Sequence, residues 1–320
     1  MLAPLLTTRA ERASIADFHW ADVVISSGGG FTTDNYYFDH LLAGYGLGLA
    51  LGKKMVILGQ TLGPFLEERN LHAVGDVISR FDLVVVRDAQ SLEIGRRMGI
   101  PEGVLALAAD MTFNVPSPPT LEAPCSGPRP RIGVSVRKWS YPNSDAKAEH
   151  ASYVARMAAA LDLLIERTGA AITFLSTCQG EPAYPYRDDE VAAEIRRAMR
   201  LEGKTKIDVE FNTPQRFMSK IADFDMIIGT RMHACILAML TGVPAVNVEY
   251  EFKSRELFRR MGLEDLVLGI ATFTPEQLVC MVERVLGDRP SVAAKITAEI
   301  AQLRRLNAAA ENRLGEILRG

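Results

Sequence analysis

Short apolar runs rich in Val and Ile alternate along the chain with longer segments in which apolar residues recur every three or four positions. The short runs predict buried strands, and the longer segments predict helices between them. In the first part of the chain we expect strands at residues 22–26, 55–58, 83–86 and 104–108, with helices at 36–51, 66–80 and 88–98. This alternation is typical of a parallel sheet that helices cover on both faces.

The same pattern resumes near residue 131, and it predicts strands at 132–136, 171–175, 207–209, 226–228 and 245–248. Thr213-Pro214 and Thr274-Pro275 each place a capping hydroxyl before a proline at the first helical position. They predict helices at 214–222 and 275–286. A last helix at 291–318 has one apolar stripe that a single Asn interrupts, which favours packing on its own protein over the alternative of a coiled-coil dimer.

Residues 116–130 separate the two parts, with six prolines and no apolar period. Such a composition is typical of an inter-domain linker. We therefore expect two α/β domains, residues 1–122 and 123–320, the second including the last helix.

Composition and charge narrow the class of protein. The chain has 320 residues, 48% of them hydrophobic, and a net charge of −3 without a Lys/Arg cluster, which argues against nucleic acid as a partner. That small charge divides into −5 for residues 1–128 and +2 for residues 129–320, so an anionic ligand should prefer the second domain. The four scattered cysteines, together with the lack of a long apolar run or a signal peptide, indicate a soluble cytoplasmic protein with reduced thiols.

Three glycines, Gly28, Gly29 and Gly30, directly follow the first expected strand. Consecutive glycines expose main-chain N–H groups and allow a ligand to come close. The alternative is a tight turn with Phe31 as a plug. A dinucleotide fingerprint is incomplete because Thr33 stands where the third glycine is required, and no metal-binding motif is present.

The strongest local signal is the segment 225–244, in which a buried strand ends at Gly229 and a helix is expected to follow. Thr230 can cap that helix, with Arg231 and His233 in its first turn. A helix N-terminus attracts anions, an Arg adds donors, and the macrodipole disfavours a cationic imidazole. Arg137, just past the end of another strand, adds a second cation, so the three side chains could clamp a small dianion. A core-facing His with a structural Arg is the alternative.

The order of several motifs resembles the polysaccharide pyruvyl transferases. The resemblance rests on segments 28–30, 59–64, 86–91, 109–110, 135–137, 229–234 and 242–244, with Tyr250 and Lys253. It implies two Rossmann-like domains in a glycosyltransferase-B-like arrangement with the active site in a central cleft. It further implies transfer of the enolpyruvyl group of phosphoenolpyruvate onto a sugar as a ketal, without a cofactor. Family members open with a strand and an Asn-x-Gly-Asp segment, so we expect a short variant or a displaced start.

The resemblance also implies roles for residues. Arg137, Arg231 and His233 would contact phosphoenolpyruvate, with Thr230, Tyr250 and Lys253 in the same substrate site. His233 would transfer a proton or donate a hydrogen bond to the departing phosphate. The glycine-run domain would hold the acceptor, and three carboxylates at strand ends, which could equally be caps or turn residues, are candidates near the sugar: Asp34, Asp88 and Asp110.

Two other functions remain open: a nucleotide-sugar glycosyltransferase of the same architecture, and a non-catalytic sugar- or phosphate-binding homologue. The expected acceptor is a sugar of a cell-surface polysaccharide, or a lipid-linked oligosaccharide that would bring the chain to the inner face of the membrane. The sequence leaves peripheral membrane association and homo-oligomerisation open.

Overall fold

The computed structural model describes residues 8–34, 38–117, 129–139, 145–181, 184–210 and 213–319. The chain forms two compact units, one of Met1–Asn114 with Gln302–Gly320 and one of Val115–Ala301. The first unit therefore ends before the expected division at 122/123. It also includes residues 302–320, the last part of the final helix, which we expected in the second domain. Most of the expected linker, residues 118–128, lies outside the described residues.

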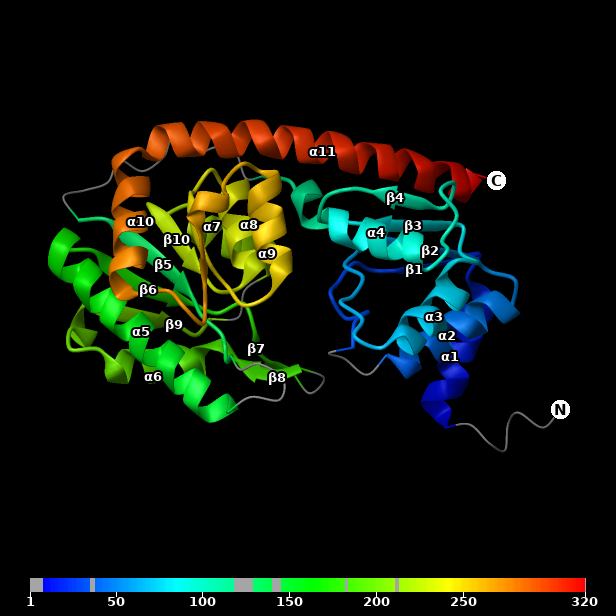
Figure 1. The fold of residues 1–320 in the computed structure, drawn as a ribbon, viewed down its shortest axis with the longest axis horizontal. Coiled ribbons are helices and arrows are strands. Elements are labelled where there is room, and N and C mark those ends of the chain that lie inside the picture. Colours follow the sequence, from blue (N-terminus) through cyan, green and yellow to red (C-terminus); the bar gives the residue numbers. More distant parts are fainter. Residues whose placement is uncertain are drawn as a thin grey trace. The chain divides into compact units, whose positions relative to one another are not determined.

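Unit 1 is built on a four-stranded parallel sheet in the order β1-β2-β3-β4 (Figure 1). Its strands are β1 (Val23–Ser26), β2 (Lys54–Gln60), β3 (Leu83–Val86) and β4 (Leu105–Leu107), and its helices are α1 (Arg9–Trp20), α2 (Asp39–Ala50), α3 (Glu68–Ile78), α4 (Ala89–Arg97) and the 3-10 turn η2 (Met111–Asn114). Each crossover leads to the next strand in the same direction. Because such crossovers are right-handed, α2, α3 and α4 lie on one face of the sheet.

The other face of this sheet is covered by the C-terminal part of α11 (Arg289–Arg319). Three apolar residues of the helix pack with four of the sheet and its edge: Ala310, Leu314 and Ile317 with Val56, Leu83, Val85 and Ala108. The stripe of the last helix is thus buried in its own chain, as expected. A single helix completes the second face because the connections between the strands all cover the first.

Unit 2 contains a six-stranded parallel sheet in the order β12-β11-β10-β5-β6-β9. Its elements are β5 (Arg131–Ser135), α5 (Ala146–Thr168), β6 (Ala171–Leu175), β7 (Gln179–Glu181), β8 (Tyr184–Arg187), α6 (Asp188–Ala198), η3 (Glu202–Lys204), β9 (Thr205–Asp208), α7 (Pro214–Ile221), β10 (Met226–Gly229), α8 (Met232–Leu240), β11 (Ala245–Glu249), α9 (Phe252–Arg260), η4 (Glu264–Leu266), β12 (Val267–Gly269) and α10 (Pro275–Gly287). The chain moves outward through β5, β6 and β9 and then returns across the sheet to β10, β11 and β12. Right-handed crossovers therefore place α5 and α6 on one face and α7, α8 and α9 on the other.

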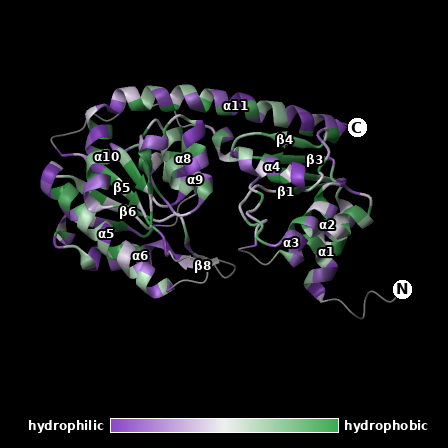
Figure 2. Ribbon diagram, viewed as in Figure 1, coloured by the Kyte–Doolittle hydropathy of each residue, from purple (hydrophilic) through white to green (hydrophobic). Residues whose placement is uncertain are grey.

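The alternation of strands and helices is confirmed in both units, and the fold class is α/β. Figure 2 shows the hydrophobic strands at the centre of each sheet, under helices of mixed hydropathy. Both expected caps are present: Thr213 and Thr274 accept hydrogen bonds from the third residue of α7 and of α10. The pattern missed α1, the β7–β8 hairpin and β12, which are short or weakly apolar.

Candidate functional site

The candidate site of unit 2 lies at the carboxyl edge of its sheet. Ser135, Gly229 and Asn247 are aligned in register on three adjacent parallel strands, β5, β10 and β11. The segments that follow these strands therefore leave the sheet side by side, at the edge where open α/β sheets bind ligands. They carry four of the residues that the sequence singled out: Arg137, Thr230, Arg231 and Tyr250.

Helix α8 begins one residue later than we expected, and Thr230 does not cap it. The N-cap is Arg231, and no side chain makes a capping hydrogen bond. The buried Thr230 hydroxyl instead lies 2.9 Å from the hydroxyl of Tyr153 on α5. Gly229 allows α8 to pack closely on β10, because a Cβ there would collide with the sulfur of Cys235. A tight strand-to-helix turn thus replaces a side-chain cap.

Arg231 is held by a buried carboxylate that the sequence did not reveal. Its guanidinium Nη2 lies 2.6 Å and its Nε 3.2 Å from Oδ1 of Asp188, the first residue of α6. The other oxygen of Asp188 accepts hydrogen bonds from the Thr177 amide and hydroxyl and from the Cys178 amide. The side chains of Arg231 and Asp188 are only 10% and 1% exposed, so Arg231 is fixed in position as well as charged. Asp188 was not predicted from the sequence; the only local signal is the acidic first turn of α6, which Asp188 opens.

Arg137 and Lys253 flank one aromatic ring. The Arg137 guanidinium lies over the ring of Tyr250, 3.7 Å from its centroid, and Lys253 Nζ is 5.7 Å from the same centroid. Lys253 also forms a 2.5 Å ion pair with Glu251. Stacking on an aromatic face orients a guanidinium without using up its hydrogen-bond donors. The structure thus brings Arg137 together with Tyr250 and Lys253, which lie far from it in the sequence.

His233 is the second residue of α8, and its side chain is exposed. It therefore does not face the core, the alternative that the sequence left open. Next to Thr230, burial raises the pKa of the Tyr153 phenol well above its usual range. Burial also raises the pKa of Cys178, although the charge of Arg231 opposes this shift.

The three candidate carboxylates of unit 1 each have a structural partner. Asp34 accepts hydrogen bonds from the amides of Leu66 and Glu67, at 2.6 and 3.0 Å, and from the Asn70 side chain at 2.8 Å, so it caps the start of α3 from outside the helix. Burial alone would raise the pKa of Asp34, but the bond from Asn70 and the two amides hold it below its usual value.

Asp88 is the N-cap of α4, and its second oxygen accepts from the hydroxyl of Thr61. Asp110 forms a 2.5 Å ion pair with Arg87, in which both side chains are 7% exposed. Arg87 in turn donates to Thr61 at 2.8 Å, so the ends of β2 and β3 and the segment after β4 share one polar network. These contacts correspond to the cap and turn roles that the sequence left open for both carboxylates.

The glycine run approaches β2 very closely. A Cβ on Gly28 would lie 2.5 Å from the carbonyl oxygen of Gly59 and 2.6 Å from that of Leu58. A Cβ on Gly29 would collide with the ring of Phe31, which is the plug that the sequence offered as the alternative. Close packing therefore explains why Gly28 and Gly29 lack a side chain.

No helix among the described residues is both long and apolar enough to cross a membrane. The same part of the chain contains no group of three or more His, Cys, Asp or Glu side chains that could hold a metal ion.

Comparison with known proteins identifies relatives in sequence and in fold. The family model described as polysaccharide pyruvyl transferase matches residues 4–251. The amylovoran biosynthesis protein AmsJ of Erwinia amylovora is 29% identical over 300 residues, which cover 89% of this chain and 70% of AmsJ. In fold, the chain is similar to HepE of Anabaena, solved with UDP and glucose, with a TM-score of 0.58 and 14% identity over 97% of this chain and 80% of HepE.

A second fold relative is the sucrose-phosphate synthase of Thermosynechococcus elongatus, with a TM-score of 0.55 and 11% identity over 99% of this chain and 81% of the synthase. These likenesses show that the fold is of the glycosyltransferase-B type.

Proposed function

Because the chain belongs to the polysaccharide pyruvyl transferase family, we propose that it transfers the enolpyruvyl group of phosphoenolpyruvate onto a sugar as a ketal and releases phosphate. The observation that carries the proposal is the set of cations at the carboxyl edge of the unit 2 sheet, where Arg137 lies over Tyr250 and the buried Arg231 precedes α8. Phosphoenolpyruvate offers two anionic groups, a phosphate and a carboxylate. A guanidinium with fixed orientation and an uncapped helix N-terminus suit such a ligand.

In this proposal the two hydroxyls of the acceptor form bonds to the C2 carbon of the enolpyruvyl group, and the bond from that carbon to the phosphate oxygen breaks. One hydroxyl proton ends on the methylene carbon, which becomes a methyl group, and the other leaves with phosphate. Arg137 and Arg231 stabilise the negative charge of the donor and of the departing phosphate. His233, exposed on the first turn of α8, moves a proton or donates to the phosphate, while Thr230 and Lys253 support the same site.

Unit 1 supplies the acceptor side in this proposal. The three candidate carboxylates, Asp34, Asp88 and Asp110, already have partners in the fold. In the proposal they therefore hold the loops around the acceptor site in place, and the glycine run lines that site. The acceptor is a sugar of a cell-surface polysaccharide or its lipid-linked precursor, and the reaction takes place in the cytoplasm.

A donor screen tests the proposal. Phosphoenolpyruvate should raise the melting temperature of the wild-type chain and of Arg131→Ala, but not that of Arg137→Ala. Arg131 is the first residue of β5 and Arg137 lies two residues beyond its other end, so the first is a matched control for the second. Stabilisation by UDP- or GDP-sugars without an effect of phosphoenolpyruvate would instead identify a nucleotide-sugar glycosyltransferase.

Turnover is then measured as phosphate release together with the pyruvate mass increment on the glycan. Binding without turnover on any offered glycan would indicate a non-catalytic homologue. His233→Ala should abolish phosphate release while the fold remains intact, and normal turnover of this variant would overturn the assignment of the site.

A further inference from the structure

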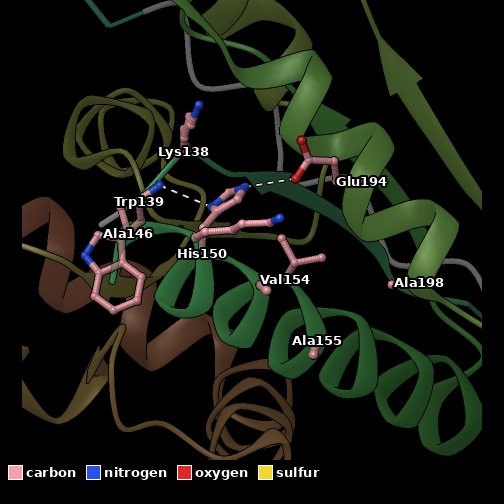
Figure 3. A pocket seen from close by; sticks show the side chains of 10 residues that line it. Lys138, Trp139, Ala146, His150, Val154, Ala155, Glu194 and Ala198 are labelled. Carbon is pink, nitrogen blue, oxygen red and sulfur yellow. Dashed lines mark hydrogen bonds and ion pairs between the residues drawn. The ribbon is translucent and has the colours of Figure 1, made fainter. Parts of the chain in front are cut away.

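The segment Arg137–Trp139 follows β5 and lies beside a cavity of about 630 Å³ that α5, α6 and the segment itself line. Figure 3 shows Trp139 and His150 on one side of this cavity and Glu194 on the other. Because a cavity adjoins the segment, dense side-chain packing does not hold it from that side. Specific contacts from the neighbouring helix α5 therefore contribute to fixing its position.

The first of these contacts comes from His150 on α5. Its Nδ1 accepts from the Trp139 amide at 3.4 Å, and its Nε2 lies 2.9 Å from Oε2 of Glu194 on α6 (Figure 3). Since Nδ1 can accept only through its lone pair, the proton is on Nε2, which donates to Glu194. Glu194 thus selects the tautomer that binds the segment.

The second contact comes from Tyr153, one helical turn further along α5. Its fully buried hydroxyl lies 2.9 Å from Oγ1 of Thr230, and the nearby Arg137 amide opposes the rise that burial causes in the pKa of the phenol. Its ring meets the Trp139 ring edge to face, with centroids 6.4 Å apart. Tyr153 thus joins the segment after β5, which carries Arg137, to the segment after β10, which carries Arg231.

We propose that His150 and Tyr153 are positioning residues that hold the segment Arg137–Trp139, so that the guanidinium of Arg137 meets the anionic donor from a fixed place over Tyr250. Glu194 acts through His150. The inference rests on the proposed function for the identity of the donor, and on the contacts of His150 and Tyr153 for the positioning.

Four variants separate positioning from general packing. His150→Ala removes the hydrogen bond to the Trp139 amide. Tyr153→Phe removes the hydroxyl that lies near the Arg137 amide and bonds to Thr230, and it keeps the ring against Trp139. His150→Asn places an amide oxygen near the position of Nδ1 and should restore much of the lost effect. Lys147→Ala is the matched control, because Lys147 lines the same cavity from the same helix.

Two measurements are made on the full-length chain: amide hydrogen exchange of a peptide that contains the segment, and the KM and kcat for phosphoenolpyruvate. We expect faster exchange and a KM about tenfold higher in His150→Ala and in Tyr153→Phe, with kcat changed much less, because ground-state donor binding is what is weakened. Lys147→Ala should match the wild type in both, and circular dichroism controls for folding.

Unchanged exchange in both variants would overturn the proposal, because the segment would then not depend on these bonds. Faster exchange with an unchanged KM would also overturn it, since the bonds would then be structural only. A wild-type chain that does not bind phosphoenolpyruvate overturns the proposed function instead, and the exchange rates still decide whether the two side chains hold the segment.

Discussion

The buried pair of Asp188 and Arg231 gives a sharp prediction for stability. Asp188→Ala removes two hydrogen bonds to the Arg231 guanidinium and three to Thr177 and Cys178, and it leaves a cation with a 10% exposed side chain without its carboxylate. Breaking one side of a buried ion pair costs about 3–5 kcal/mol, because the remaining charge stays desolvated. We therefore expect the free energy of unfolding of unit 2 to fall by about that amount.

Urea unfolding measures the loss. In a Trp20→Phe background, which removes a tryptophan that is 87% exposed, Trp139 is the only tryptophan and reports on unit 2. With an m-value of about 1–3 kcal/mol per molar urea, the midpoint should fall by at least about 1 M. Separate observation of unit 2 matters because a chain of two units need not unfold in one step.

Asp189→Ala is the matched control. The neighbouring Asp189 pairs with Arg187 at 2.6 Å, but the Arg187 side chain is 49% exposed, and a pair of this kind contributes about 0–1 kcal/mol. If Asp188→Ala lowered stability no more than Asp189→Ala, the reasoning about the buried pair would be refuted.

Three further predictions test other parts of the fold. Asp34→Ala should destabilise unit 1 by about 1 kcal/mol, because it removes a cap. The pKa of Asp34 is lowered in the folded chain, so this loss of stability should persist above about pH 4, the unfolded pKa, and vanish as the pH falls through the folded pKa. Urea titrations at several pH values measure the difference between the variant and the wild type. Asn307→Leu leaves the buried amide of Ala109 without its 2.8 Å acceptor, so we expect faster hydrogen exchange at Ala109 and a loss of about 1–3 kcal/mol; unchanged exchange would contradict this. Among the three described cysteines, iodoacetamide at pH 8 should label the exposed Cys280 first and leave Cys235 unmodified in the folded chain, because burial raises the pKa of Cys235 to about 12. Peptide mass spectrometry reads out the order, and rapid labelling of Cys235 would count against its burial.

The sequence predicted the strands well because their apolar runs are buried on both faces, as at Met226–Gly229. It also located the helices that open with Thr-Pro, since a cap and a fixed φ act locally. It failed for β12, a strand of three residues whose pairing depends on its neighbour β11. Three residues are too few to show the hydrophobic period of a strand.

For the candidate site, the sequence located the cations but not their partners. Arg137 and Arg231 were predicted because each follows a buried strand, and parallel strands end at a common edge. Tyr250 was named only through the resemblance to the family. Asp188 and Tyr153 escaped notice because each lies on a helix far away in the chain and reaches the site only through tertiary packing. The Thr230 cap was wrong because its hydroxyl bonds to Tyr153 instead.

The return of α11 to unit 1 has a consequence for the order in which the protein is made. The sheet face formed by Val56, Leu83 and Val85 is covered by Ala310 and the residues after it. These residues follow unit 2 in the chain, so unit 1 can be completed only after unit 2 has been synthesised. Until then its apolar face stays open to chaperones or to aggregation. A premature stop before residue 302 would therefore leave the sheet of unit 1 without its second covering layer.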